Sequence, residues 1–130
     1  MSEKELVNSV RDKVNILLAA KGYGEIVSFA VGKGSITEFR FSFNGSKANE
    51  CSLILEINLS EDEGEIVYTF ETEMFSHIVF RYHDSVEGGI SDQNLIKLVN
   101  NVDKFVENST EAYVEYNKSL FKAGEILRQC

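Results

Sequence analysis

The chain has little cysteine and no long apolar run, and both absences narrow the class of protein. Its 130 residues include only two cysteines, Cys51 and Cys130, which are too few for a disulfide framework and favour reduced thiols. No apolar run reaches the ~18 residues of a membrane span, and the first residues form an amphipathic pattern, not a signal sequence. We therefore expect a cytoplasmic protein without a membrane span, and the length suits a single domain over residues 1–130.

Sequence signatures of catalysis and of metal binding are also missing. Residues 32–35 read Gly-Lys-Gly-Ser, but a phosphate-binding loop places its lysine directly before serine or threonine and leads into a helix. The two histidines, His77 and His83, lie on an expected strand and about 20 Å apart, too far to share a metal ion. We expect a non-enzymatic protein that needs no cofactor and no metal.

Basic residues are scarce between residues 61 and 93, and this scarcity accounts for the acidity of the chain. The segment holds nine acidic residues and one basic residue, a balance equal to the net charge of −8 of the whole chain. Such a surface repels nucleic-acid phosphates and attracts basic proteins over about 8 Å at physiological salt. We therefore expect a basic protein partner and no direct nucleic-acid binding. The predicted partner-binding residues are Glu61, Asp62, Glu63, Glu65, Glu71 and Glu73.

These acidic residues also have a simpler interpretation, which the sequence leaves open. A charged hairpin keeps a protein soluble and stops the edge of a sheet from pairing with other chains. Residues 61–65 and Glu73 are expected at opposite ends of one strand pair, so the six carboxylates do not have to form a single patch.

The first element that the sequence predicts is an amphipathic helix over residues 2–22. Ser2 is followed three residues later by Glu5, which is a capping-box pattern, and Gly22 is expected to end the helix. The apolar residues that fall on one side of this helix are Leu6, Val7, Val10, Val14, Leu17 and Leu18.

Apolar and polar residues then alternate with a period of two, which is typical of half-buried strands. A weaker strand is expected at residues 25–31, and clearer ones at 35–43, 51–59 and, as two strands, within 66–82. In an antiparallel pair, facing residues have a constant number sum, so the connection lengths predict the register. The predicted facing pairs are Phe29–Thr37, Phe41–Leu53, Leu59–Ile66, Phe70–Phe80 and Glu73–His77.

All four connections are compatible with a five-stranded antiparallel meander that has one continuous apolar face. A three-residue loop at 32–34 joins the first two strands, and residues 44–50 and 61–64 join the next ones. The last turn, at 74–76, lacks the glycine or asparagine usual in such loops. A single bent strand over residues 64–83 is therefore the alternative for the last hairpin.

The last third of the chain predicts a helix of unusual length. From Leu95 to Leu127 apolar residues recur at alternating steps of four and three, interrupted only by Ser109. Such a helix would be about 57 Å long, whereas a compact chain of this size is about 35 Å across. We favour a break at residues 108–110, where Asn108 can cap a second helix. The alternative is a projecting helix that pairs with a second copy as a homodimer.

These features predict an α+β protein whose helices pack on the phenylalanine-bearing face of the sheet. The expected function is a non-catalytic protein-binding module, of the inhibitor, immunity-protein or chaperone kind, that engages a basic partner through its acidic sheet end. One alternative is a binder of a small apolar ligand held between the sheet and the helices. Another is a structural homodimer formed through the C-terminal helix.

Overall fold

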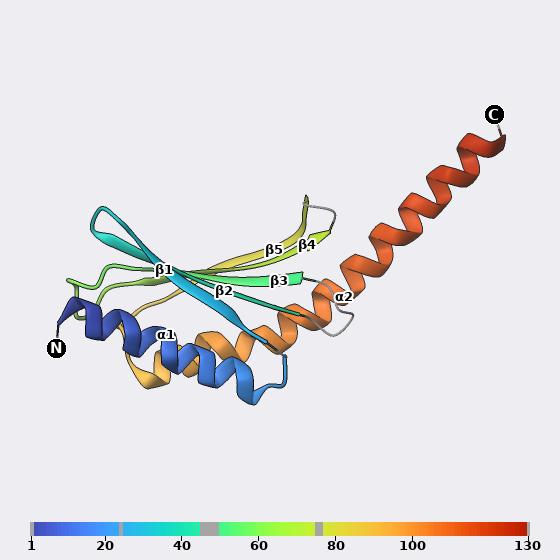
Figure 1. Ribbon diagram of the computed structural model, residues 1–130. Coiled ribbons are helices and arrows are strands. Elements are labelled where there is room, and N and C mark those ends of the chain that lie inside the picture. The colour runs from blue at the N-terminus through green and yellow to red at the C-terminus, as the bar shows by residue number, and fades with distance from the viewer. Residues whose placement is uncertain (1, 24, 45–49, 75–76, 130) are drawn as a thin grey trace.

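The computed structural model describes residues 2–23, 25–44, 50–74 and 77–129. The five strands form one antiparallel sheet in sequence order, and both helices lie on the same side of it (Figure 1). The predicted α+β meander is therefore confirmed. The elements are α1 (Glu3–Ala20), β1 (Val27–Lys33), β2 (Ile36–Asn44), β3 (Glu50–Ile57), β4 (Ile66–Met74), β5 (His77–Val86) and α2 (Asp92–Gln129).

Local sequence signals set both ends of α1. The Ser2 hydroxyl accepts a hydrogen bond from the Glu5 backbone N–H at 3.2 Å, which caps the first turn as predicted. Gly22 follows the last turn with a φ of 81°, a left-handed conformation that glycine adopts without strain. The buried residues of α1, which hold it against the sheet, are Val10, Val14 and Leu18.

The core lies between the helices and one face of the sheet. Alternate residues of β2, β3 and β4 point into it, and Phe41 faces Leu53 across the β2–β3 pair in the predicted register. On the other half of the sheet, the Phe105 ring of α2 stacks on Phe70 of β4 with ring centroids 5.1 Å apart. The helices therefore cover the phenylalanine-bearing face, as the sequence predicts.

The predicted pairing of β1 with β2 is wrong. A two-residue turn at 34–35 joins the strands instead of a three-residue loop, so Phe29 lies opposite Arg40 and not opposite Thr37. Gly34 makes this tight turn possible because its φ of 65° is the left-handed value that such turns require. The shift of register by an odd number of residues turns the strand over, and Phe29 points away from the core.

In this register, the face of β1 that points toward α1 carries small side chains. Ser28 and Ala30 lie on the inner face of β1, and the Asn15 side-chain amide of α1 donates a hydrogen bond to the Ser28 hydroxyl at 3.0 Å. A phenylalanine on this face would hold the helix farther from the strand. The larger residues of β1 lie on the outer face and are exposed: Val27, Phe29 and Val31.

The β3–β4 and β4–β5 pairings keep the predicted inward-facing residues, but each register differs from the predicted one by two residues. Ile57 faces Ile66 and Phe70 faces Tyr82, and in each pair the sequence predicted a partner two residues away. An even slip leaves the inward-facing set unchanged because the side-chain period of a strand is two. The β3–β4 connection is thereby lengthened to residues 58–65.

β4 and β5 form the predicted hairpin and not a single bent strand. A β-bulge shifts the register near its end, so Glu73 faces Ile78 and the predicted pairing of Glu73 with His77 is wrong. Residues 75–76 of the predicted turn lie outside the described residues.

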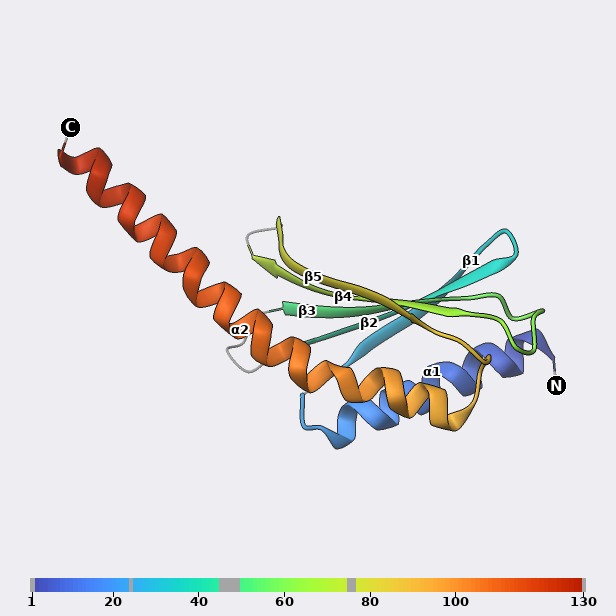
Figure 2. The ribbon, with the colours of Figure 1, turned by 180° about the vertical axis from the view of Figure 1, so that it is seen from behind.

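The break that we favoured at residues 108–110 is wrong, because α2 is one continuous helix of 38 residues. Its N-terminal part runs along the sheet and its C-terminal part projects beyond it in both views (Figures 1 and 2). Polar residues inside a helix cost only about 0.5 kcal/mol each, which does not suffice to interrupt it. Neither described helix combines the length and the apolarity that a membrane crossing requires.

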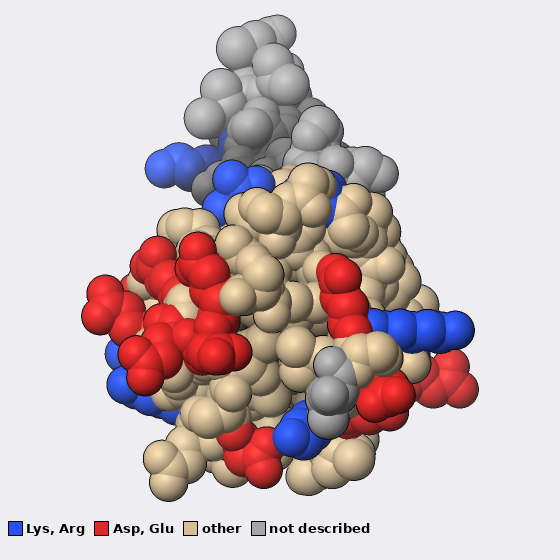
Figure 3. Space-filling view, turned by 90° about the vertical axis from the view of Figure 1, so that its left-hand side faces the viewer, with Lys and Arg blue, Asp and Glu red and all other residues tan. Residues whose placement is uncertain are grey.

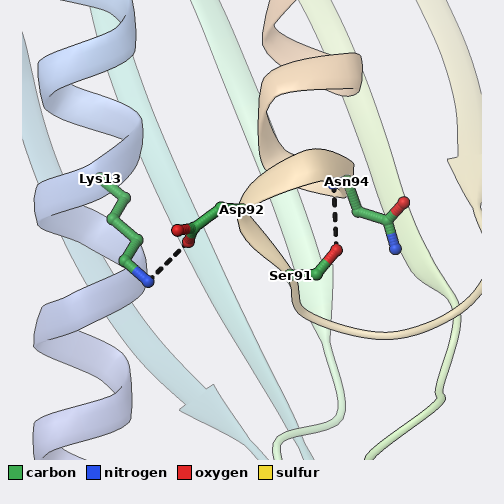
Figure 4. Close-up of polar contacts among 4 residues, drawn as sticks. All are labelled: Lys13, Ser91, Asp92 and Asn94. Carbon is green, nitrogen blue, oxygen red and sulfur yellow. Dashed lines mark hydrogen bonds and ion pairs between the residues drawn. The ribbon is translucent and has the colours of Figure 1, made fainter.

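A polar contact joins α1 to the start of α2. Lys13 Nζ lies 2.7 Å from Asp92 Oδ1, and the Ser91 hydroxyl accepts a hydrogen bond from the Asn94 backbone N–H at 3.1 Å (Figure 4). Ser91 therefore caps α2 as the sequence predicts. The same first turn thus both begins the helix and attaches it to its neighbour.

A second polar contact joins the end of α1 to the middle of α2. Asp103 accepts hydrogen bonds from Lys21 Nζ at 2.6 Å and from the Tyr23 hydroxyl at 2.5 Å. The bond from Lys21, together with that from Tyr23, holds the pKa of Asp103 below its usual 3.8. Burial and the neighbouring Asp103 raise the pKa of Tyr23 far above its usual value, so the phenol remains a donor at neutral pH.

We expect Asp103→Asn to remove the stability that depends on this ionised carboxylate. Because the folded-state pKa lies below the unfolded value of 3.8, the contribution is present above that pH and is lost as the pH falls through the folded-state pKa. Between about pH 7 and about pH 3 the wild type should lose more stability than the variant, by less than about 1 kcal/mol for an exposed pair. Urea titrations at both pH values measure this difference, and equal losses would contradict the assignment.

Candidate functional site

The β3–β4 connection folds into short turns that hold its carboxylates outward. The Asn58 side chain accepts hydrogen bonds from the backbone N–H and the hydroxyl of Ser60 at 3.1 and 2.7 Å. The Glu61 N–H donates to the Asn58 carbonyl, and the Gly64 N–H donates to the Glu61 carbonyl. The exposed carboxylates of this connection belong to Glu61, Asp62, Glu63 and Glu65.

The connection between β5 and α2 packs directly on these turns. The Gly89 N–H donates to the Gly64 carbonyl at 2.9 Å, and a Cβ atom on Gly89 would clash with the Asp62 carbonyl oxygen. The Asn94 side-chain amide donates to the carbonyls of Gly89 and Glu87 at 2.8 and 3.3 Å, which fixes the second loop on the first turn of α2. The two loops therefore support each other, and Glu87 is held beside the acidic turns.

One acidic surface results, which we call the acidic end. Its members are Glu61, Asp62, Glu63, Glu65 and Glu87, all of them exposed. Figure 3 looks onto this end of the molecule and shows acidic side chains gathered on one part of it. None of these five carboxylates forms an ion pair with any residue that the structure describes. Their negative charge is therefore not compensated within the described chain.

Glu87 belongs to this surface although the sequence did not point to it. A signal was nevertheless present: in a meander, the connections before β4 and after β5 lie at the same end of the sheet. Glu87 is also followed directly by two glycines with positive φ, Gly88 and Gly89, which allow a close approach between loops.

The structure separates the other two predicted residues from the acidic end. Glu71 lies on the outer face of β4 with only 7% of its surface exposed. Two nitrogens of the Arg81 guanidinium each lie 3.0 Å from the Glu71 Oε1 atom. Glu73 lies toward the far end of β4, opposite Glu50 of β3. Four of the six predicted carboxylates are thus brought together, one is occupied by an arginine and one is remote.

A groove opens beside the acidic end, between the start of α1, the β1–β2 turn and the β3–β4 connection. Its volume is about 450 Å³, and Leu6 and Leu59 form apolar walls while Glu3 adds a carboxylate. A long basic side chain matches this arrangement, because its aliphatic stem can lie on the leucines while its cationic head reaches the carboxylate. The remaining lining residues are Gly34, Ser35 and Ser60.

The other sequence candidates have structural roles. His83 Nδ1 lies 2.8 Å from the Thr69 hydroxyl on the outer sheet face, and the side chain of His77 lies outside the described residues. Lys33 pairs with Glu38 at 3.1 Å beside the β1–β2 turn, so the Gly-Lys-Gly-Ser segment closes a hairpin. Within the described ranges, no group of three or more His, Cys, Asp or Glu side chains is placed to hold a metal ion.

The aromatic residues of the sheet are used for packing and for a buried hydrogen bond. Phe105 of α2 stacks on Phe80 with ring centroids 5.4 Å apart. Burial raises the pKa of Tyr68 to about 12, and its hydroxyl accepts a hydrogen bond from the Asn101 amide at 3.0 Å. The groove between β5 and α2 at this place has a volume of about 90 Å³, well below the roughly 300–1,000 Å³ of ligand sites. The ligand-binding alternative stays a prediction: the groove between β5 and α2 is small, and the larger groove of about 450 Å³ lies beside the acidic end.

We expect Gly89→Ala to destabilise the protein more than Gly22→Ala does. Both glycines have positive φ, which costs an alanine about 1–2 kcal/mol, but a Cβ on Gly22 meets open space whereas one on Gly89 meets the Asp62 carbonyl. The extra clash should add at least about 1 kcal/mol. Urea unfolding measures the free energy of unfolding of both variants. An equal decrease in the two would show that the loop at Gly89 is not in close contact with the loop at Asp62.

The acidic end and its groove are defined by geometry and charge: two mutually supporting loops, five exposed carboxylates and a leucine-walled recess. No family model, no curated protein and no solved structure matches this chain.

Proposed function

We propose that this chain is a non-catalytic protein-binding module that engages a basic protein partner through the acidic end. Inhibitors, immunity proteins and chaperones are the classes that work in this way. The proposed setting is the cytoplasm, where the buried Cys51 thiol, 3.5 Å from the Thr72 hydroxyl, would stay reduced.

The observation that carries the proposal is the uncompensated charge of the acidic end. Its five carboxylates are exposed and have no ion-pair partner among the described residues, and the contact of Gly89 with Gly64 holds their loops in place. Because these loops are already ordered, binding costs less conformational entropy than it would on a free loop.

The charge of the acidic end also indicates the chemistry of the partner. Clustered carboxylates speed the association of a positively charged surface and repel the phosphates of nucleic acids. The adjacent groove, walled by Leu6 and Leu59, adds a recess for one lysine or arginine side chain of that partner. A basic protein surface fits both features.

Reversing the charge of the acidic end should abolish capture of the partner. We expect the triple variant Glu61→Lys, Asp62→Lys and Glu63→Lys to lose the proteins that the wild type captures at low salt from the native organism. The physical reason is that attraction between exposed charges turns into repulsion, and salt screens both. Affinity capture at low and high salt, followed by mass spectrometry, measures the loss.

A matched control separates the acidic end from net charge. Asp12→Lys, Glu107→Lys and Glu111→Lys change the same number of exposed carboxylates on the two helices, away from the acidic end. This variant should keep the partners. If the acidic-end variant keeps them as well, or if both variants lose them equally, the proposal is wrong.

A structural homodimer formed through the C-terminal part of α2 is a second candidate. The observation that favours it is the continuity of α2, whose C-terminal part projects beyond the sheet (Figures 1 and 2). In the sequence, the apolar steps of four and three continue through this part, which is the pattern of helices that pair side by side.

Removing the projecting part tests this candidate. A chain that ends at residue 110 keeps every α2 residue known to be buried in the described part of the chain, the last of which is Val106. If the helix mediates a dimer, sedimentation equilibrium should show a dimer for the full chain and a folded monomer for the shortened one. A shortened chain that remains dimeric would rule this interface out.

A further inference from the structure

The two edges of the sheet differ in how they are protected against pairing with another chain. β5 carries Arg81, His83 and Asp84 among its apolar residues, and its pairing with β4 contains a bulge. Charges and bulges of this kind discourage edge-to-edge association. β1 has no charged residue from Val27 to Gly32 and no irregularity in its pairing. Apart from Lys33 at its last position, the edge of β1 has none of these protections.

β1 also exposes apolar side chains on the outer face of the sheet. Val27, Phe29 and Val31 are 66%, 47% and 44% exposed, respectively. Both helices lie on the opposite side of the sheet and leave this face open (Figure 1). The three side chains form an apolar row along the unpaired edge.

The turn between β1 and β2 determines which backbone groups of β1 are free. A two-residue turn is closed by a hydrogen-bonded pair, here Lys33 and Ile36. Hydrogen-bonded and non-hydrogen-bonded pairs then alternate along the strands, so the odd-numbered residues of β1 direct their N–H and C=O groups toward β2. The even-numbered residues, Ser28, Ala30 and Gly32, direct theirs away from the sheet.

We propose that β1 pairs antiparallel with β1 of a second copy, about a twofold axis at Phe29, and joins the two sheets edge to edge. The even-numbered residues then form the hydrogen bonds across the axis. On the outer face, Phe29 lies opposite its own equivalent and Val27 lies opposite Val31 of the second copy. These are non-hydrogen-bonded pairs, in which facing side chains approach most closely.

Charge complementarity selects this register. It places the exposed Glu25, which precedes β1 by two residues, opposite Lys33 of the other copy, at both ends of the apolar row. The side chain of Lys33 is 61% exposed although it pairs with Glu38, so a second carboxylate can reach it. A slip of two residues would place Lys33 opposite Val27, or Glu25 opposite Val31. A register shifted by one residue would place the free N–H and C=O groups of one copy opposite groups of the other copy that already bond to β2.

Edge pairing also determines where the acidic ends lie. The β1–β2 turn and the acidic end belong to the same end of the sheet, where both border the groove lined by Gly34 and Ser60. A twofold axis across β1 reverses the second copy, so the joined sheet carries one acidic end at each extremity. The pairing itself does not rest on the proposed function of the acidic end.

The oligomeric state of point variants tests the interface. The full chain should be a dimer in sedimentation equilibrium, and Phe29→Lys should raise its dissociation constant at least about tenfold because two cations then meet at the axis. Ile78→Lys is the matched control, since Ile78 is 45% exposed on the opposite edge strand, and it should leave the dimer intact. A monomeric wild type, or a dimer that Phe29→Lys does not weaken, would overturn the proposal.

Cysteine cross-linking tests the register. Facing residues of a non-hydrogen-bonded antiparallel pair have Cα atoms about 4.5 Å apart, within the range of disulfides. With Cys130→Ser present and Cys51 buried, Phe29→Cys alone should give a disulfide-linked dimer under mild oxidation. Val27→Cys alone should not, whereas Val27→Cys combined with Val31→Cys should. Failure of Phe29→Cys to cross-link, or equal cross-linking by Val27→Cys alone, would contradict this register.

Discussion

The burial of a single face of the sheet beneath two helices is the constraint from which most of this structure follows. Side chains alternate along each strand, so every strand must place its bulkier apolar residues under the helices or leave them in solvent. β2, β3 and β4 place theirs in the core, among them Phe41, Leu53 and Phe70. β1 does the opposite: Ala30 packs against the core, whereas the larger Val27 and Phe29 are exposed on the outer face.

The sequence was sufficient for the fold class and for one register, and the reasons for its failures are physical. The β2–β3 pairing follows from strong alternation on both strands. In β1 the alternation indicates the wrong inner face, because its larger apolar residues, Val27, Phe29 and Val31, lie on the outer face. The two-residue turn at Gly34, with its left-handed backbone conformation, sets the β1–β2 register and therefore which face of β1 points inward. The continuity of α2 was missed for a different reason, since Asn108 resembles a helix cap but does not act as one.

In the candidate site too, residues adjacent in the sequence were correctly predicted to lie together, whereas residues whose position depends on strand register or loop contacts were not placed correctly. Four neighbouring carboxylates were predicted together because they are adjacent in the sequence. Glu71 looked equally free, but the true β4–β5 register, two residues from the predicted one, places Arg81 opposite it. Glu87 was left out of the predicted set although the meander places its loop at this end of the sheet, and the hydrogen bond from Gly89 to Gly64 shows that the two loops are in contact. Repulsion within the acidic end opposes folding, and this contact holds the loops together against it.

The projecting part of α2 has a hydrodynamic consequence. A helix that extends beyond its domain increases the friction of a particle with little gain in mass, and α2 would span about 57 Å from end to end. A monomer of 14.6 kDa would therefore elute from a size-exclusion column ahead of compact proteins of equal mass. Its elution volume alone would imitate that of a larger assembly, whereas sedimentation equilibrium and light scattering report mass without reference to shape.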